Sequence, residues 1–312
     1  MSKVCILSWH FNTPEITLEY FIKQSPGRSG KWKDMEAVTD PFSADFVFVM
    51  DGYNHPLPQD RVIYFGAHPF VPGFSKSFRT FEDKKCLAKV RLDKHLNMGE
   101  WWCEYDYDTL ANLKCPEKDR QLVCIMTYQT HNLMYAQRVN FMHSFVRDQM
   151  ENITKCEGLF DLYGRPEEKF RQDGILSHAY RGPLGQNNPD GYLNQHTQGK
   201  IPALLPYEYS LEFDVGPTQN YLSERFYDSL LLWCKPIYYG SSNARDFIPQ
   251  DAFGMIDIDT TENAAGRVFQ EMDTLGWFES YKAISAARDL LLNKYNIWPY
   301  MHNVIHNLEK FQ

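Results

Sequence analysis

The chain has 312 residues, of which 43% are hydrophobic and 15% aromatic. It can bury a large core and is too long for one small domain, so we expect two domains. Its 32 basic and 40 acidic residues leave a net charge of −8, which excludes a general electrostatic attraction to nucleic acid or to an anionic membrane surface. A phosphate group must therefore be bound at a local site.

The cysteines and the lengths of the apolar runs indicate the cellular compartment of the protein. The 7 cysteines are odd in number, scattered, and never spaced as Cys-x-x-Cys, which predicts free thiols in a reducing environment. The first apolar run, of about five residues, is too short for a secretory signal. No segment approaches the roughly 18–20 apolar residues of a membrane span. These features predict a cytoplasmic protein.

Strand-like and helix-like segments alternate along the chain, which predicts an α/β fold with parallel sheets. The predicted strands are 4–8, 46–50, 62–65, 122–127, 159–163, 209–213, 237–239 and 254–258. The predicted helices are 14–23, 136–150, 223–234, 262–274, 278–294 and 299–309.

A polar stretch at residues 112–120 is the predicted linker. It divides an N-terminal domain, residues 1–115, from a C-terminal domain, residues 116–294, and we expect a helix within 295–312 to complete the N-terminal domain. Residues 182–200 are rich in Gly, Asn, Gln and Pro, which predicts a long surface loop beside a cleft.

The most informative stretch is 221–249, YLSERFYDSLLLWCKPIYYGSSNARDFIP. Ser223 is placed to cap a helix whose first N–H groups favour an anion. Arg225, within the first turn, adds a permanent positive charge and a fork of donors suited to phosphate oxygens. The rest of the helix is apolar around its circumference, which predicts burial. Pro236 is predicted to end the helix before a short buried strand.

This stretch resembles the C-terminal motif of the family ten glycosyltransferases, the α1,3/4-fucosyltransferases, in which a Glu followed by Lys or Arg precedes a Pro-Ile-Tyr-x-Gly strand. The resemblance extends to YEYSLEFD at 207–214, to Arg138, and to DLYGR at 161–165. It covers roughly residues 122–259.

The resemblance implies a GT-B architecture, in which two Rossmann-like domains face each other across a cleft. It implies an inverting transfer of a sugar from a nucleotide sugar to a hydroxyl of a glycan or glycoprotein acceptor, with no metal and no cofactor beyond the donor. GDP-fucose is the first donor expected. UDP-xylose, UDP-galactose or UDP-glucose is the alternative, and a catalytically silent binder of nucleotide sugars or glycans is a third interpretation.

The resemblance also assigns roles to individual residues. Arg138 and Arg225 are expected to bind the donor diphosphate from neighbouring strand ends, with Arg138 in the first turn of its helix. Glu224 is expected to bind sugar hydroxyls or to stabilise charge at the anomeric carbon. The ordinary alternatives are surface charges on helices and, for Glu224, compensation of the helix dipole.

Five further residues are candidates for the donor site. Asn220 and Tyr221 precede the helix and are candidates for ribose or sugar contacts. Glu212 and Asp214 share one face of a strand by alternation, so either is placed to hold a hydroxyl. Tyr163 ends another strand, where stacking on a nucleobase and core packing are equally good interpretations.

The general base is where the sequence departs from the family. Ala67 stands where the family has Glu, and the adjacent His68, with an unperturbed pKa of about 6.5, is the candidate base. Asp51, after the predicted strand 46–50, is an alternative base. His10 and Asn12, after the first predicted strand, are candidates for lining the acceptor side. The Asp-x-Asp patterns at 106–108 and 257–259 are common by chance, and we expect no metal there.

Overall fold

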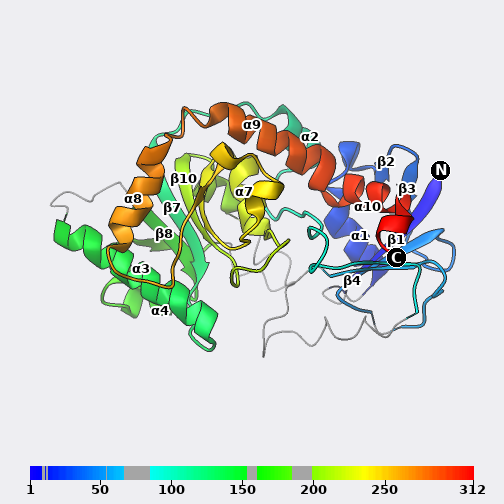
Figure 1. The fold of residues 1–312 in the computed structure, drawn as a ribbon, viewed down its shortest axis with the longest axis horizontal. Helices are drawn as coiled ribbons and strands as arrows, with labels where there is room; N and C mark the ends of the chain where they lie inside the picture. The colour runs from blue at the N-terminus through cyan, green and yellow to red at the C-terminus, as the bar shows by residue number, and fades with distance from the viewer. Residues whose placement is uncertain (9–10, 12, 54, 67–84, 153–159, 185–198) are drawn as a thin grey trace.

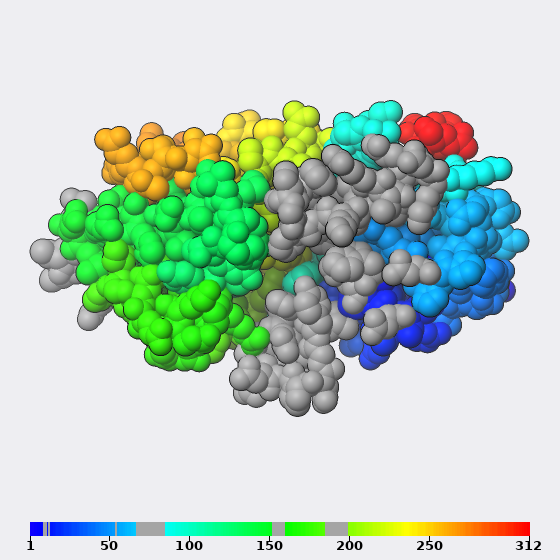
Figure 2. All heavy atoms as spheres, turned by 90° about the horizontal axis from the view of Figure 1, so that it is seen from below, coloured from blue at the N-terminus to red at the C-terminus, as the bar shows by residue number. Residues whose placement is uncertain are grey.

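A computed structural model describes residues 1–8, 11, 13–53, 55–66, 85–152, 160–184 and 199–312 (Figure 1). The chain forms two sheets of six strands, each covered by helices. In space-filling form the molecule shows two lobes, one mainly blue and one green to orange (Figure 2). The α/β fold of two Rossmann-like halves, expected from the sequence, is confirmed.

The N-terminal sheet has the strand order β2-β3-β1-β4-β5-β6. All its strands pair in parallel except β2, which forms a hairpin with β3. The central strands are almost wholly buried, because both faces of the sheet are covered. The strands are β1 (Ser2–Ser8), β2 (Lys31–Trp32), β3 (Met35–Ala37), β4 (Phe46–Met50), β5 (Val62–Phe65) and β6 (Ala88–Val90).

Two helices from opposite ends of the chain pack on this sheet. They are α1 (Pro14–Ile22), which Thr13 caps, and α10 (Ile297–Ile305). The red C-terminal helix lies among the blue N-terminal elements (Figure 1). Trp298 of α10 is fully buried, and its indole Nε1 donates to the carbonyl oxygen of Phe21 at 3.0 Å. The last helix therefore belongs to the N-terminal core.

The second sheet has the order β12-β11-β10-β7-β8-β9, and all its strands are parallel. Read from the first strand of this half, the arrangement is the 3-2-1-4-5-6 order of the Rossmann fold. The strands are β7 (Arg120–Thr127), β8 (Phe160–Arg165), β9 (Tyr180–Gly182), β10 (Tyr207–Phe213), β11 (Lys235–Tyr239) and β12 (Gly254–Met255).

Helices cover both faces of the second sheet. On one face α3 and α8 pack against alternate strand residues such as Leu122, Cys124 and Leu211. On the other face α7 and α9 pack with residues that include Val123 and Tyr238. The helices of this half are α3 (Leu133–Asn152), α4 (Glu167–Gln172), α6 (Lys200–Leu204), α7 (Glu224–Leu231), α8 (Ala264–Thr274) and α9 (Tyr281–Leu290).

The two halves are joined by two crossings of the chain. The outgoing segment leads from β6 to α2 (Tyr107–Asn112), and the returning one passes from α9 through a π-helical turn (Leu291–Tyr295) into α10. The crossings touch where Gly99 N–H donates to the carbonyl oxygen of Tyr295 at 2.8 Å. A Cβ on Gly99 would lie 2.3 Å from the Tyr227 ring, so only glycine allows this approach.

Several element boundaries differ from those predicted. Helix α7 ends at Leu231 instead of running to residue 234, because Trp233 adopts φ 65° and turns the chain. Pro236 is inside β11, and its expected role as helix terminator is wrong. The predicted strand at 254–258 pairs only over Gly254–Met255. The short elements β2, β3, β6, β9, α2, α4 and α6 were not predicted.

Among the residues described above, no helix has both the length and the apolar character needed to cross a bilayer. The six cysteines in that part of the chain are free thiols, and Cys156 lies outside it.

Candidate functional site

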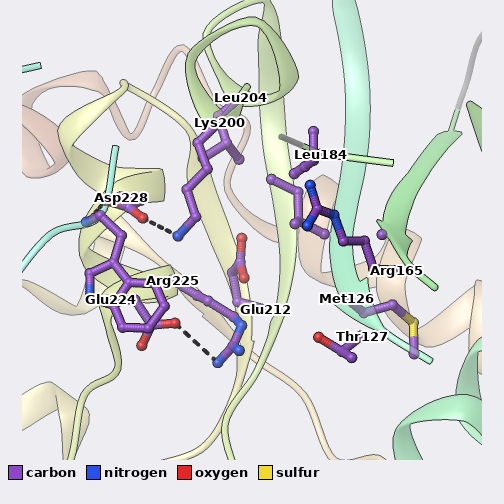
Figure 3. Close-up of a pocket in the computed structure, with 13 residues that line it drawn as sticks. Met126, Thr127, Arg165, Leu184, Lys200, Leu204, Glu212, Glu224, Arg225 and Asp228 are labelled. Atoms are coloured by element: carbon purple, nitrogen blue, oxygen red, sulfur yellow. Dashed lines mark hydrogen bonds and ion pairs between the residues drawn. The ribbon is translucent and has the colours of Figure 1, made fainter. Parts of the chain in front are cut away.

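The candidate site lies at the carboxyl ends of β7 and β10, where the strand order of the second sheet reverses. Open α/β sheets bind ligands at this topological switch point. An open hollow lies there, beside the first turn of α7 (Figure 3). It is lined by Trp102, Ile125, Met126, Thr127, Gly164, Arg165, Leu184, Lys200, Leu204, Glu212, Glu224, Arg225 and Asp228.

Glu224 and Arg225 open α7 and face the hollow. An Arg225 Nη1 to Glu224 Oε1 distance of 3.4 Å makes them an ion pair, and 31% of the Arg225 side chain remains exposed. Glu224, beside it, holds the pKa of Arg225 above its usual range. Ser223 is the N-cap residue, but its side chain makes no capping bond. The first turn of α7 thus presents a fixed cation and its helix N-terminus to the hollow.

Arg138 lies behind Arg225 on α3. It is 5% exposed, and its Nε and Nη2 atoms have no hydrogen-bond partner among the described residues. Burial and the neighbouring Arg225 charge lower its pKa to about 10. Its guanidinium rests over the Tyr135 ring at 4.8 Å. Because α3 begins at Leu133, Arg138 is in the second turn of the helix instead of the predicted first.

Glu212 reaches the hollow from the end of β10, between Arg225 and Lys200 (Figure 3). It is 2% exposed and accepts a hydrogen bond from Ser229 Oγ at 2.7 Å. Its other oxygen, Oε2, has no partner within the described residues. Burial raises the pKa of Glu212 to about 8. A carboxyl group at this position can therefore gain or release a proton near neutral pH.

A buried ion pair forms another part of the wall. Asp228 of α7 is fully buried and pairs with Lys200 Nζ of α6 at 2.5 Å. The same carboxylate accepts the backbone N–H groups of Trp102 and Cys103 at 2.8 and 2.9 Å. Burial lowers the pKa of Lys200, but Asp228 and Glu224 together more than offset this effect, so the pKa is raised above its usual value.

Three other residues predicted for the sugar-donor site are buried within the protein. Asn220 adopts φ 59°. Its side-chain amide donates a hydrogen bond to the carbonyl oxygen of Leu92 and accepts one from the side-chain amide of Asn243. Asp214 is 1% exposed and accepts from Tyr238 Oη. Tyr221 is also buried. None of these three predicted residues lines the hollow; they support the loop that leads into α7.

Tyr163 also lies away from the lining. It packs partly buried against the core under α7. The residues that follow it, Gly164 and Arg165, do line the hollow. A Cβ on Gly164 would lie 1.9 Å from the Met126 carbonyl oxygen. The close approach of β8 to β7 at this edge therefore requires glycine.

The candidate base, His68, and its neighbour Ala67 lie outside the described residues, as do His10 and Asn12. Asp51 is buried at the end of β4 with φ 55°. The acids of the Asp-x-Asp patterns do not line the hollow. Asp106 instead caps α2, and Asp257 accepts the N–H group of Asp259 at 2.8 Å.

The sequence analysis did not identify Lys200, Asp228 or Trp102 as site residues. Lys200 and Asp228 are 28 positions apart, and Trp102 is 126 positions from Asp228, so no local motif joins them. One signal was present: Asp228 is an acidic residue in the mostly apolar part of the helix that follows Glu224 and Arg225. A charge on a helix predicted to be buried requires a partner.

Comparison with known proteins identifies the architecture. No protein-family model matches the chain, and no curated protein matches it. Among solved structures, Alr3699/HepE of Anabaena in complex with UDP-glucose is similar over 100% of both chains, with TM-score 0.52 and 8% identity. A glycosyltransferase of Rickettsia africae is similar over 99% of this chain and 98% of its own, with TM-score 0.52 and 10% identity.

An α1,3-fucosyltransferase structure is also similar, over 95% of this chain and 92% of its own, with 12% identity and a TM-score of 0.43. The two matches with TM-score 0.52, HepE and the Rickettsia africae glycosyltransferase, show that the chain has the GT-B fold found in glycosyltransferases. At these identities the likeness concerns the fold alone, because one fold can host many reactions.

We predict that Asp228→Asn strongly destabilises the protein. The substitution leaves the Lys200 ammonium buried without its counter-charge, which typically costs about 3–5 kcal/mol. Urea unfolding followed by tryptophan fluorescence measures the effect. The control is Asp119→Asn, an exposed aspartate, for which a change within about 0.5 kcal/mol is expected. Equal stability of the two variants would contradict the assignment.

We predict that Glu212→Gln changes the pH dependence of stability. With its pKa raised to about 8, Glu212 keeps a proton in the folded state that the unfolded chain has released above about pH 4.5. Its contribution to the free energy of unfolding therefore falls as pH rises from about 5 to 8.

In Glu212→Gln the free energy of unfolding should fall less between about pH 5 and 8 than in the wild type. The expected difference is on the order of 1–4 kcal/mol. Urea titrations at several pH values, with the exposed Glu262→Gln as control, measure it. Parallel curves for wild type and Glu212→Gln would show that the group ionises normally.

Proposed function

We propose that this chain is an inverting glycosyltransferase that uses a nucleotide sugar and requires no metal for the transfer. The carrying observation is the pair of arginines at the switch point, Arg138 and Arg225. Two guanidinium groups are close enough for one to lower the pKa of the other, and the buried one has donors with no partner in the described residues.

A bound diphosphate would offset the charge repulsion between Arg138 and Arg225. Burying a cation without a counter-charge is costly, and like charges add to the cost. A dianion between Arg138 and Arg225 would be held by charge-assisted hydrogen bonds and by the N-terminus of α7. A preference for an anion at this position therefore follows from the electrostatics of the described residues.

The proposed reaction is a single displacement. A base removes the proton of an acceptor hydroxyl, the acceptor oxygen forms a bond to the anomeric carbon, and the bond to the donor phosphate oxygen breaks with inversion. Arg138 and Arg225 stabilise the charge that develops on the leaving diphosphate. Glu224 and Glu212 face the position of the sugar. His68 is proposed as the base from its place in the sequence.

The sequence motif around α7 favours GDP-fucose as the donor. UDP sugars remain the alternative, because HepE, whose structure contains UDP-glucose, has the same fold over its full length. The acceptor is proposed to be a glycan or glycoprotein hydroxyl. Base and sugar contacts decide between GDP and UDP donors, whereas the diphosphate contacts are common to both.

We predict that Arg225→Ala abolishes donor binding and that Arg138→Ala weakens it about tenfold or more. The basis is the loss of hydrogen bonds to a charged group, worth about 1.5–3 kcal/mol each. Calorimetry with GDP and with UDP measures the affinities. Arg147→Ala is the matched control, since Arg147 is exposed on the same helix as Arg138. Unchanged affinity in Arg225→Ala would remove the phosphate assignment.

The test of the proposed function is a donor panel of GDP-fucose, GDP-mannose, UDP-xylose, UDP-galactose and UDP-glucose. Transfer and hydrolysis are measured with and without EDTA. Turnover of one donor that persists in EDTA is expected, and the anomeric configuration of the product, read by NMR, should be inverted.

Two variants separate the remaining interpretations. His68→Ala should lower turnover far more than donor affinity, whereas the exposed His178→Ala should change neither. Donor binding with no turnover, against a broad set of acceptors, would support a silent binder instead of an enzyme. Retained turnover in His68→Ala would remove its assignment as the base.

A further inference from the structure

We propose that Asp34, His302 and His306 form a binding site for one divalent transition-metal ion of the Zn²⁺ type. The two histidines lie at the C-terminal end of α10, and Asp34 is in the turn between β2 and β3. Their three ligand atoms all lie within 4.8 Å of one another. This cluster is on the N-terminal sheet, and none of its residues lines the donor hollow.

The two imidazoles converge on one carboxylate. His302 and His306 are four residues apart, so a helical turn brings them onto the same side, with ring centroids 4.3 Å apart. Nε2 of His302 lies 2.9 Å from Asp34 Oδ1. Nε2 of His306 lies 3.4 Å from the same carboxylate. Both rings therefore present the same nitrogen to a common point.

The two separations between the carboxylate and the imidazole nitrogens match the coordination shell of a small ion. Zinc binds imidazole nitrogen and carboxylate oxygen at about 2.0–2.2 Å, and a tetrahedron with such bonds has edges of roughly 3.3 Å. The contacts of Asp34 with His302 and His306, 2.9 and 3.4 Å, bracket that edge. Two imidazoles and one carboxylate also suit the borderline character of zinc, and the fourth position is left for water.

The backbone holds the three ligands in place. Lys33 adopts φ 53°, a left-handed conformation that non-glycine residues rarely take, and so turns the hairpin toward α10. The carbonyl oxygen of Asp34 accepts the N–H group of Ser2 at 2.7 Å. Trp298 anchors α10 in the N-terminal core. A metal ion would replace two hydrogen bonds without moving either element.

The site would fasten the N-terminal hairpin to the C-terminal helix. In Figure 1, α10 lies against β2 and β3, at the end of the molecule away from α3 and α4. The bound ion would therefore stabilise the N-terminal half and take no part in the sugar transfer. Its removal would change thermal stability, while donor binding, which is proposed to need no metal, would remain.

The experiment is a titration of the metal-stripped full-length chain with Zn²⁺ by calorimetry, together with thermal unfolding. One equivalent is expected to bind and to raise the melting temperature by about 4 °C or more, because a ligand that binds only the folded state stabilises it. The double variant His302→Gln/His306→Gln should lose both effects, and the exposed His178→Gln should keep them.

Asp34→Asn is the second variant; the Asp34 side chain is 55% exposed, so this chain should fold. It is expected to bind Zn²⁺ at least tenfold more weakly. Unchanged stoichiometry and affinity in these variants would place the ion elsewhere, for example on free thiols, and would overturn the proposal. Absence of binding to the wild type would do the same. GDP or UDP affinity measured alongside reports separately on the proposed transferase function.

Discussion

The carboxylate of Asp228 holds the site and the outgoing crossing of the chain together. It is fully buried, pairs with Lys200, and accepts the backbone N–H groups of Trp102 and Cys103. One charge thus joins helix α7, helix α6 and the segment that arrives from the N-terminal half. A buried charge with these partners favours one relative position of the three segments, because other positions leave Asp228 or Lys200 buried without a partner. The hollow of the C-terminal half is built around this pair.

The remaining charges of the hollow follow from the same constraint. Arg225, Glu224 and Asp228 all lie on the first two turns of α7, so the contacts of Asp228 also fix the direction of Arg225. Glu212, from β10, meets these groups at the switch point, and Arg138 approaches from the other face of the sheet. Opposite and like charges are thereby concentrated in a small, partly desolvated volume, where an anionic ligand interacts strongly.

Sequence reasoning succeeded where the signal was local. The continuous apolar runs at Phe46–Met50 and Val62–Phe65 became strands with those bounds, because buried parallel strands need apolar residues on both faces. It failed at Pro236, which lies in strand β11. Strand β12 pairs only with Ile237 and Tyr238 of β11, so Pro236 loses no hydrogen bond to β12. It did not anticipate that the polar atoms of Asn220 and Asp214 form hydrogen bonds to distant parts of the chain.

The sequence by itself determined the α/β class and the placing of Glu224 and Arg225 at the start of a buried helix, since periodicity and local motifs carry that information. The two Rossmann-like halves were expected from the family resemblance. Only the tertiary structure decided that Glu212, Lys200 and Asp228 share one hollow, that Asn220, Asp214 and Tyr221 support it from behind, and that Asp34 meets two histidines of the last helix. Those contacts join residues far apart in the chain, and burial, which sets their charges, exists only after packing.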